Sequence, residues 1–114
     1  MKYTKASIVI AIAILSAFQA HAQRPGGIYI YPPGSNGCGD YLEDRKNSAN
    51  DDFYAAWAWG FLSAYNTFGT EPQVRGRLSK GTILAYLDKH CRNEPLSNVM
   101  SGVGKLAKEL GEKG

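Results

Sequence analysis

Apolar residues recur at helical spacing along most of the chain after residue 37. The strongest pattern covers residues 51–68, where apolar or small side chains recur every three or four positions and predict one long helix. The members of this stripe are Phe53, Ala56, Trp57, Gly60, Phe61, Ala64, Tyr65 and Phe68. We expect the stripe to face the core, and we expect Trp57, at its centre, to be a core residue.

The back of the same helix is also largely apolar and carries Ala55, Trp59, Leu62 and Asn66. A helix that is apolar nearly all round is usually buried by neighbours on several sides. We therefore expect another helix or the segment before residue 38 to cover Trp59 and Leu62. If nothing covers them, they form an exposed patch of the kind that marks an interaction site. Glycine is unfavourable in the middle of a helix, and the close approach of another helix would explain the presence of Gly60 there.

The same spacing predicts a shorter helix before this one and another after it. The first covers residues 38–47 and has Ser35 or Asn36 as its N-cap. The other covers residues 79–92 and begins after the N-cap Ser79. Its inner face consists of Ile83, Leu84, Leu87 and Cys91.

The last predicted helix starts near Pro95 and ends at Gly111. Its narrow apolar stripe consists of Leu96, Val99, Met100, Val103, Leu106, Ala107 and Leu110. Gly102 and Gly104 weaken this helix, so it needs packing against its neighbours to persist. Residues 38–114 are therefore predicted to form an all-α domain of about four helices around one small core.

The segment of residues 23–37, QRPGGIYIYPPGSNG, is rich in glycine and proline and predicts an extended, loosely held arm. Tyr29, Ile30 and Tyr31 alternate as in a strand, but no partner strand is evident in the sequence. The arm is either a tail that lies on the helices or a sticky segment that binds a partner. We favour the tail, because chain termini are usually poorly ordered.

Residues 1–22 have the three parts of a secretory signal peptide. These parts are Lys2 with Lys5, the apolar stretch Ile8–Phe18, and the small-x-small site Ala20-His21-Ala22. The alternative is a membrane anchor, but the apolar stretch is too short to span a bilayer comfortably. We expect the mature chain to begin at Gln23 and to be a soluble protein of the periplasm, with secretion as an alternative.

Composition and charge narrow the function classes. The chain has 114 residues, 44% hydrophobic and 20% charged, which is typical of one globular domain. Its formal net charge is +3, and Lys2 with Lys5 leaves with the signal peptide, so the mature chain is close to neutral. That balance argues against nucleic acid as a partner, and no later stretch is long enough to insert in a membrane.

Cys38 and Cys91 are the two cysteines of the chain, and in an oxidising compartment they are expected to form one structural disulfide. The alternative is a redox or nucleophilic pair, but the spacing is not that of a CxxC motif. A metal site would need more ligands, and His90 is the one histidine of the mature chain. We therefore expect neither a metal nor a cofactor.

No sequence motif of a hydrolase or of a nucleotide-binding protein is visible, so no catalytic residue is predicted. His90 lies near the end of a predicted helix, where the helix dipole accounts for it. Arg75 and Arg77, with Lys80, form a small basic cluster that is either a solvated loop or a site for an anionic partner. Our candidate binding residues are therefore Trp59, Leu62, Arg75 and Arg77.

Several short motifs together resemble a widespread group of small exported bacterial proteins. They are Cys38-x-x-Tyr41-Leu42, Trp57-x-x-Gly60-Phe61-x-x-x-Tyr65-Asn66, Gly81-x-Ile83-x-x-Tyr86-Leu87-x-x-x-Cys91 and then Pro95. The layout is similar to HdeA-type acid-stress chaperones and to Tai-type immunity proteins of type VI secretion, both small, helical, periplasmic and disulfide-bonded. Tai-type proteins often carry a further cysteine in the region of the central helix, which this chain lacks.

These observations favour a protein that binds another protein without catalysis. The first hypothesis is an HdeA-like holdase, a chaperone that holds unfolded clients. The second is an immunity-type inhibitor of one secreted toxin, and a small hydrolase ranks last. A holdase should bind many clients and expose apolar surface at low pH, whereas an inhibitor should stay folded and bind one protein tightly.

Overall fold

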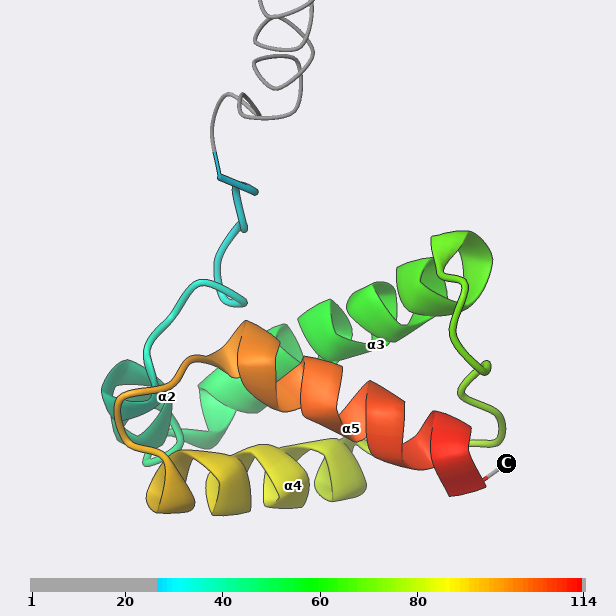
Figure 1. The fold of residues 1–114 in the computed structure, drawn as a ribbon. Helices are drawn as coiled ribbons and strands as arrows, with labels where there is room; N and C mark the ends of the chain where they lie inside the picture. The colour runs from blue at the N-terminus through cyan, green and yellow to red at the C-terminus, as the bar shows by residue number, and fades with distance from the viewer. Residues whose placement is uncertain (1–26, 114) are drawn as a thin grey trace, which may run out of the picture.

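The computed structural model describes residues 27–113, which form helices joined by short loops. The elements are α2 (Cys38–Asp44), the 3-10 helix η1 (Ser48–Asn50), α3 (Asp51–Phe68), α4 (Lys80–Asn93) and α5 (Val99–Lys113). Figure 1 shows α3, α4 and α5 as the three long helices, with α2 at the end where α3 begins and α4 finishes. The prediction of an all-α domain of about four helices is confirmed. The predicted signal peptide, residues 1–22, lies outside the described residues.

Helix α4 is the centre of the domain, because it packs against α2, α3 and α5. The N-cap Ser79 is confirmed: its hydroxyl accepts a hydrogen bond from the backbone N–H of Thr82. The large side chains that are completely buried come from all four helices and include Tyr41, Tyr54, Ile83, Leu87, Val99 and Val103. A domain this small buries little apolar surface, so each of these contacts contributes a substantial part of its stability.

The predicted bounds of α3 are confirmed, but the predicted inner face is wrong. The residues of α3 that are buried are Tyr54, Ala55, Ala58 and Leu62. This face lies about 120° around the helix from the predicted stripe. The core side of α3 is built from alanines, which let the neighbouring helices approach closely, and from Tyr54, whose hydroxyl donates to Asp44. Phe53 and Phe68, both of the predicted stripe, are 56% and 84% exposed.

Trp57 is partly buried rather than a core residue, and it is covered by a turn of the arm instead of by a helix. A Cβ atom at Gly34 would lie 2.0 Å from the Trp57 ring, so only glycine fits at this contact. Trp57 stacks on Phe61 at a centroid distance of 5.5 Å. Gly60 has no described atom within 4 Å of its Cβ position, so the close approach expected there is wrong.

The second half of the predicted arm is fixed to the start of α5, which corrects the expectation of a loosely held segment. Backbone N–H groups of Val99 and Met100 donate to the carbonyls of Asn36 and Gly34, at 3.0 and 2.9 Å. The first N–H groups of a helix have no partner within the helix, so the arm satisfies two of them. Its outer part, with Ile28, remains exposed.

The other helix ends differ from the predictions in ways that local contacts explain. Helix α2 ends at Asp44, and its N-cap is Gly37 without a side-chain hydrogen bond. Asn47 instead caps η1 through its side chain, which offers the backbone an alternative to a longer α2.

Helix α5 begins at Val99, four residues after the predicted start at Pro95, which lies in a turn with the fully exposed Leu96. It also continues beyond Gly111, the predicted end. A Cβ at Gly111 would lie 2.6 Å from the carbonyl oxygen of Pro72, so this glycine makes room for the loop after α3.

Candidate functional site

The predicted disulfide between Cys38 and Cys91 is present and joins α2 to α4. Both cysteines are completely buried in the core. The bond is therefore a structural staple between helices, as predicted from the sequence.

A network of charged side chains around Arg45 lies beside this staple and connects α2, α3 and α4. The Arg45 guanidinium donates to both carboxylate oxygens of Asp88, at 2.9 and 3.1 Å, and to Asp51 at 2.6 Å. The Tyr41 hydroxyl also donates to Asp88, at 2.8 Å. Burial alone would raise the pKa of the Asp88 carboxyl, but the hydrogen bonds from Arg45 and Tyr41 outweigh it and lower that pKa. The carboxylate is thus held charged and occupied, which suits a structural junction.

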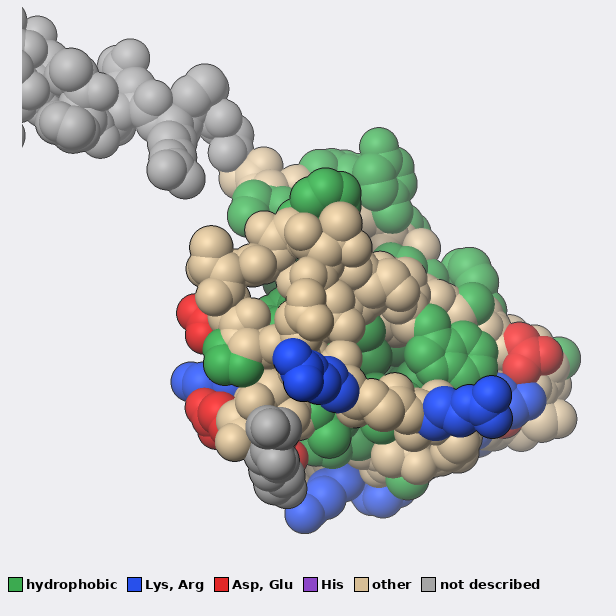
Figure 2. Space-filling model, turned by 90° about the vertical axis from the view of Figure 1, so that its right-hand side faces the viewer, with side chains coloured by type: hydrophobic (Ala, Val, Ile, Leu, Met, Phe, Trp, Pro, Cys, Tyr) green, Lys and Arg blue, Asp and Glu red, His purple; other side chains and the backbone are tan. Residues whose placement is uncertain are grey.

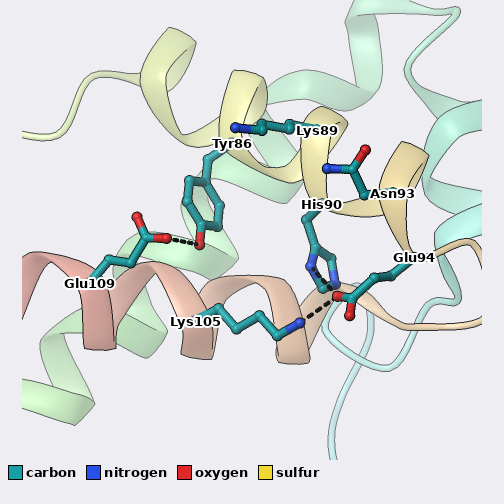
Figure 3. A pocket seen from close by; sticks show the side chains of 7 residues that line it. All are labelled: Tyr86, Lys89, His90, Asn93, Glu94, Lys105 and Glu109. Carbon is teal, nitrogen blue, oxygen red and sulfur yellow. Dashed lines mark hydrogen bonds and ion pairs between the residues drawn. The ribbon is translucent and has the colours of Figure 1, made fainter.

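His90 forms a second polar network at the end of α4 (Figure 3). Its side chain is 4% exposed, and its ring nitrogens contact Ser97 and Glu94: Nε2 lies 2.9 Å from Ser97 Oγ, and Nδ1 lies 3.1 Å from Glu94 Oε2. Glu94 also pairs with Lys105, and this hydrogen bond is the main reason that the pKa of Glu94 is lowered. The network joins α4, the turn after it and α5.

An open cavity of about 510 Å³ lies over this network. It is lined by Tyr86, Lys89, His90, Asn93, Glu94, Lys105 and Glu109. Figure 3 shows that most of these polar groups face one another. The Tyr86 hydroxyl donates a hydrogen bond to Glu109, and the Glu94 carboxylate contacts both His90 and Lys105.

The order of contacts Ser97–His90–Glu94 is the one found in serine hydrolases, where a histidine takes the proton of an attacking serine. The residues that line the cavity include His90 and Glu94 but not Ser97. The contacts account for the burial of His90 in structural terms.

A second cavity, of about 310 Å³, lies between α3 and the loop that follows it. We call it the Trp59 cavity; it is lined by Trp59, Leu62, Ser63, Asn66, Val74, Gly76 and Leu78. Trp59 is 41% exposed, whereas Leu62 is buried. The loop after α3 covers part of Trp59. The side chain is therefore partly covered, but the expectation that a helix or the arm would cover it is wrong.

The loop is held along one edge of α3 by residues spaced seven positions apart. Asp52 pairs with Lys80 at 2.8 Å, and the Trp59 indole N–H donates to the Leu78 carbonyl at 2.9 Å. Asn66 bonds both the N–H and the carbonyl of Val74, each at 2.8 Å. The segment from Val74 to Lys80 therefore runs back along α3 and is attached to it at three positions.

The structure brings the four predicted binding residues into one region. Trp59 and Leu62 line the Trp59 cavity, and Arg75 and Arg77 flank Gly76, which lines it too. Both arginines are exposed and make no ion pair with another residue in the range 27–113. Lys80, the third member of the predicted basic cluster, is instead paired with Asp52.

The outer face of α3 is a candidate site that the sequence analysis missed. It consists of the exposed residues Phe53, Ala56, Gly60, Ala64 and Phe68. Figure 2 views the domain from the end where α3 finishes. Hydrophobic side chains gather towards the top of the domain in this view, and Lys and Arg side chains lie below them. A signal for this face was present, because no charged residue occurs from Phe53 to Thr70. An exposed helix face normally carries charges.

No group of three or more His, Cys, Asp or Glu side chains in residues 27–113 is arranged to hold a metal ion. None of the described helices has the length and apolar character needed to cross a membrane. Comparisons of the chain with protein-family models, curated proteins and solved structures gave no match.

Proposed function

We propose that this chain is a non-catalytic protein-binding domain of the periplasm, and that it acts as an HdeA-like holdase for unfolded clients. The observation that carries the proposal is the outer face of α3, where Phe53 and Phe68 stand exposed on a helix surface without charge. Contiguous apolar surface of this kind on a small protein usually marks a site of protein interaction.

The chemistry of this face suits clients with little sequence in common. Aromatic side chains supply large apolar contact areas, and the absence of charge imposes no electrostatic pattern on the partner. The exposed Ile28, Tyr29 and Tyr31 of the arm add apolar surface close to the turn that covers Trp57. A surface of this kind can hold different unfolded segments through the hydrophobic effect alone.

The proposed location follows from the signal-peptide pattern and the disulfide. A disulfide persists in an oxidising compartment such as the periplasm and is rare in the cytosol. The proposal includes no cofactor, no nucleic acid and no membrane insertion after the signal peptide is cleaved. It also gives His90 no catalytic role.

The test is suppression of client aggregation, measured by light scattering of an unfolding enzyme at neutral and at acid pH. The double variant Phe53→Ser, Phe68→Ser should lose most of the protection. The matched control is Leu96→Ser, which removes an exposed apolar side chain from the turn before α5. Equal protection by the two variants, with both folded by circular dichroism, would count against the outer face of α3 as the client site.

An immunity-type inhibitor of one secreted toxin is the alternative, and the fixed loop after α3 favours it. A loop clamped at several points presents one surface, which suits one specific partner better than many clients. A toxin encoded by a neighbouring gene is the protein to test by calorimetry. Tight binding of that single protein, without protection of unrelated clients, would favour the alternative. A small hydrolase ranks last, because the sequence carries no hydrolase motif and the side chain of His90 is buried.

A further inference from the structure

We infer that the Trp59 cavity and the two arginines beside it form a docking site for an acidic peptide segment of a partner protein. One large apolar side chain of the segment occupies the cavity, and carboxylates next to it pair with Arg75 and Arg77. The inference rests on the proposed protein-binding function but uses a different surface from the outer face of α3. Trp59 lies about 200° around the helix from Trp57, on the far side from Phe68.

The walls of the cavity determine what kind of side chain fits. Leu62, Val74 and Leu78 supply aliphatic surface, and the indole of Trp59 supplies an aromatic wall. The polar residues of the lining are Ser63 and Asn66. No ionisable side chain lines the cavity. Its volume of about 310 Å³ is at the lower end of the range for ligand pockets, so it suits one side chain better than a large cofactor.

The site is formed before any partner arrives. The Trp59 N–H and both polar ends of the Asn66 side chain are occupied by the loop backbone, so these groups are satisfied and the wall is fixed. Gly76 has φ of 91°, a left-handed conformation that residues with a Cβ rarely adopt. A partner therefore does not have to order the loop, which lowers the entropic cost of binding.

The charges around the cavity favour an acidic partner. Arg75 and Arg77 are adjacent to its lining residue Gly76, are exposed, and have no carboxylate partner among the described residues. Lys80, farther along the same edge, is neutralised by Asp52. Glu71 is the one acidic residue of this loop. The aliphatic part of the cavity wall and the unpaired guanidinium groups together fit an acidic peptide with one apolar side chain, and the near-neutral charge of the mature chain disfavours nucleic acid.

The experiment uses the oxidised mature chain carrying Trp57→Phe, so that Trp59 is the one tryptophan and reports on the cavity by fluorescence. The probe is a short peptide with a central leucine flanked by glutamates. Matched peptides replace the leucine by alanine or the glutamates by glutamine. A short oligothymidylate tests nucleic acid as the ligand.

The peptide should change the Trp59 emission, and affinity should fall with added salt because the ion pairs are exposed. The double variant Arg75→Gln, Arg77→Gln should bind it roughly tenfold more weakly. The control Lys89→Gln, Lys108→Gln removes the same charge from α4 and α5 and should bind normally. Leu78→Ala tests the wall, and should weaken the leucine peptide while leaving the alanine peptide unchanged.

Equal affinity in the arginine and lysine variants, equal binding of the glutamine peptide, or stronger binding of the oligonucleotide would each overturn the inference. The variant Phe53→Ser, Phe68→Ser separates the two surfaces. It should keep full affinity for the peptide even where client protection is lost. If the peptide fails to bind while Phe53 and Phe68 still protect clients, the docking site is wrong and the holdase proposal stands.

Discussion

At the scale of single residues, Gly102 shows how one missing side chain determines the packing of two helices. A Cβ atom there would lie 2.7 Å from Leu87 Cδ2 and 2.9 Å from the His90 ring. Both neighbours are buried, so neither has room to move away. From the sequence, Gly102 predicted only a weaker helix, because the approach of α4 is a tertiary contact with no local signal.

We predict that Gly102→Ala destabilises the domain by about 1–3 kcal/mol, since it overpacks the contact between α4 and α5. Gly104→Ala is the matched control, because nothing described lies within 4 Å of its Cβ position. The control should be neutral or stabilise by up to about 1 kcal/mol, as alanine favours helices over glycine. Chemical denaturation of both variants measures this, and equal effects of the two would contradict the packing argument.

The two tryptophans show what helical spacing can and cannot predict about a single side chain. Trp57 lies at the centre of the apolar stripe, yet it packs beneath the turn at Gly34, while Trp59 lies half-exposed beside the loop. Helical spacing alone predicts that the two side chains point in nearly opposite directions. It does not indicate which segments of the chain cover them.

We predict that iodide quenches Trp59 more strongly than Trp57. The reporters are Trp57→Phe, which leaves Trp59, and Trp59→Phe, which leaves Trp57. Trp59 should be quenched to an intermediate degree, because the loop covers part of its ring and its N–H is bound to Leu78. Quenching of Trp59 equal to that of free tryptophan would mean that the loop leaves it in solution.

At the scale of elements, the sequence predicts where α3 begins and ends but not which side is buried. The run from Phe53 to Thr70 has no charged residue and leaves this helix apolar nearly all round, so the hydrophobic periodicity does not single out one face. Hydrogen bonds decide the orientation instead: Tyr54 is buried because Asp44 and Asn36 satisfy its hydroxyl. Because no side of α3 from Phe53 onward carries a charge, the sequence indicated neither its buried face nor its exposed outer face.

The starts of α4 and α5 both depend on a cap in the local sequence, and α5 also depends on a distant segment. Ser79 caps α4 through its own side chain, and the start of α4 follows from it. Asn98 caps α5 in the same way, because its side chain accepts a hydrogen bond from the N–H of Ser101, and the prediction at Pro95 missed this local signal. The N–H groups of Val99 and Met100 donate instead to carbonyls of Asn36 and Gly34, more than sixty residues earlier in the chain, and no local pattern contains those contacts.

The junction of α2, α3 and α4 at Arg45 gives a prediction that depends on pH. The pKa of Asp88 is lowered from its ordinary value of 3.8 in the folded chain. The charged carboxylate therefore stabilises the fold above that value, and this contribution disappears as the pH falls through the lowered pKa. Asp88→Asn should cost about 1–3 kcal/mol at neutral pH, because it weakens hydrogen bonds to a charged partner.

The difference between Asp88→Asn and the original chain should shrink as the pH falls below about 4. Asp52→Asn serves as the control, since its pair with Lys80 is exposed and should contribute little. Thermal unfolding across this pH range measures both variants. A constant difference from neutral to acid pH would show that the stabilisation does not depend on the Asp88 charge.

At the scale of the whole molecule, the candidate sites were predicted only in part. The sequence singled out Trp59, Leu62, Arg75 and Arg77 as two separate groups, and the structure places them around one cavity. The two groups come together because the loop folds back along α3, where the Asn66 side chain bonds to the Val74 backbone. Such contacts leave no periodic pattern, so the cavity itself could not be derived from spacing.

The disulfide was predictable because it follows from cysteine count and compartment, and its effect extends over the whole domain. It closes a separation of 53 residues and joins α2, the shortest α-helix described, to the central helix α4. A helix of that length is not stable alone, so α2 depends on its tertiary contacts and on this bond. Tyr41 and Arg45, which extend the junction, depend on α2 in turn.

We predict that the double variant Cys38→Ala, Cys91→Ala loses about 4 kcal/mol of unfolding free energy, because the open chain gains entropy when unfolded. For a domain of this size that corresponds to a fall of about 20 °C in Tm. Reduction of the original chain with dithiothreitol should cause the same fall, and reductant should leave the double variant unchanged, which separates the bond from the loss of two core side chains. If the double variant melts with the original chain, then α2 is held by the Arg45 junction and the core around Tyr41, and the disulfide is dispensable for folding.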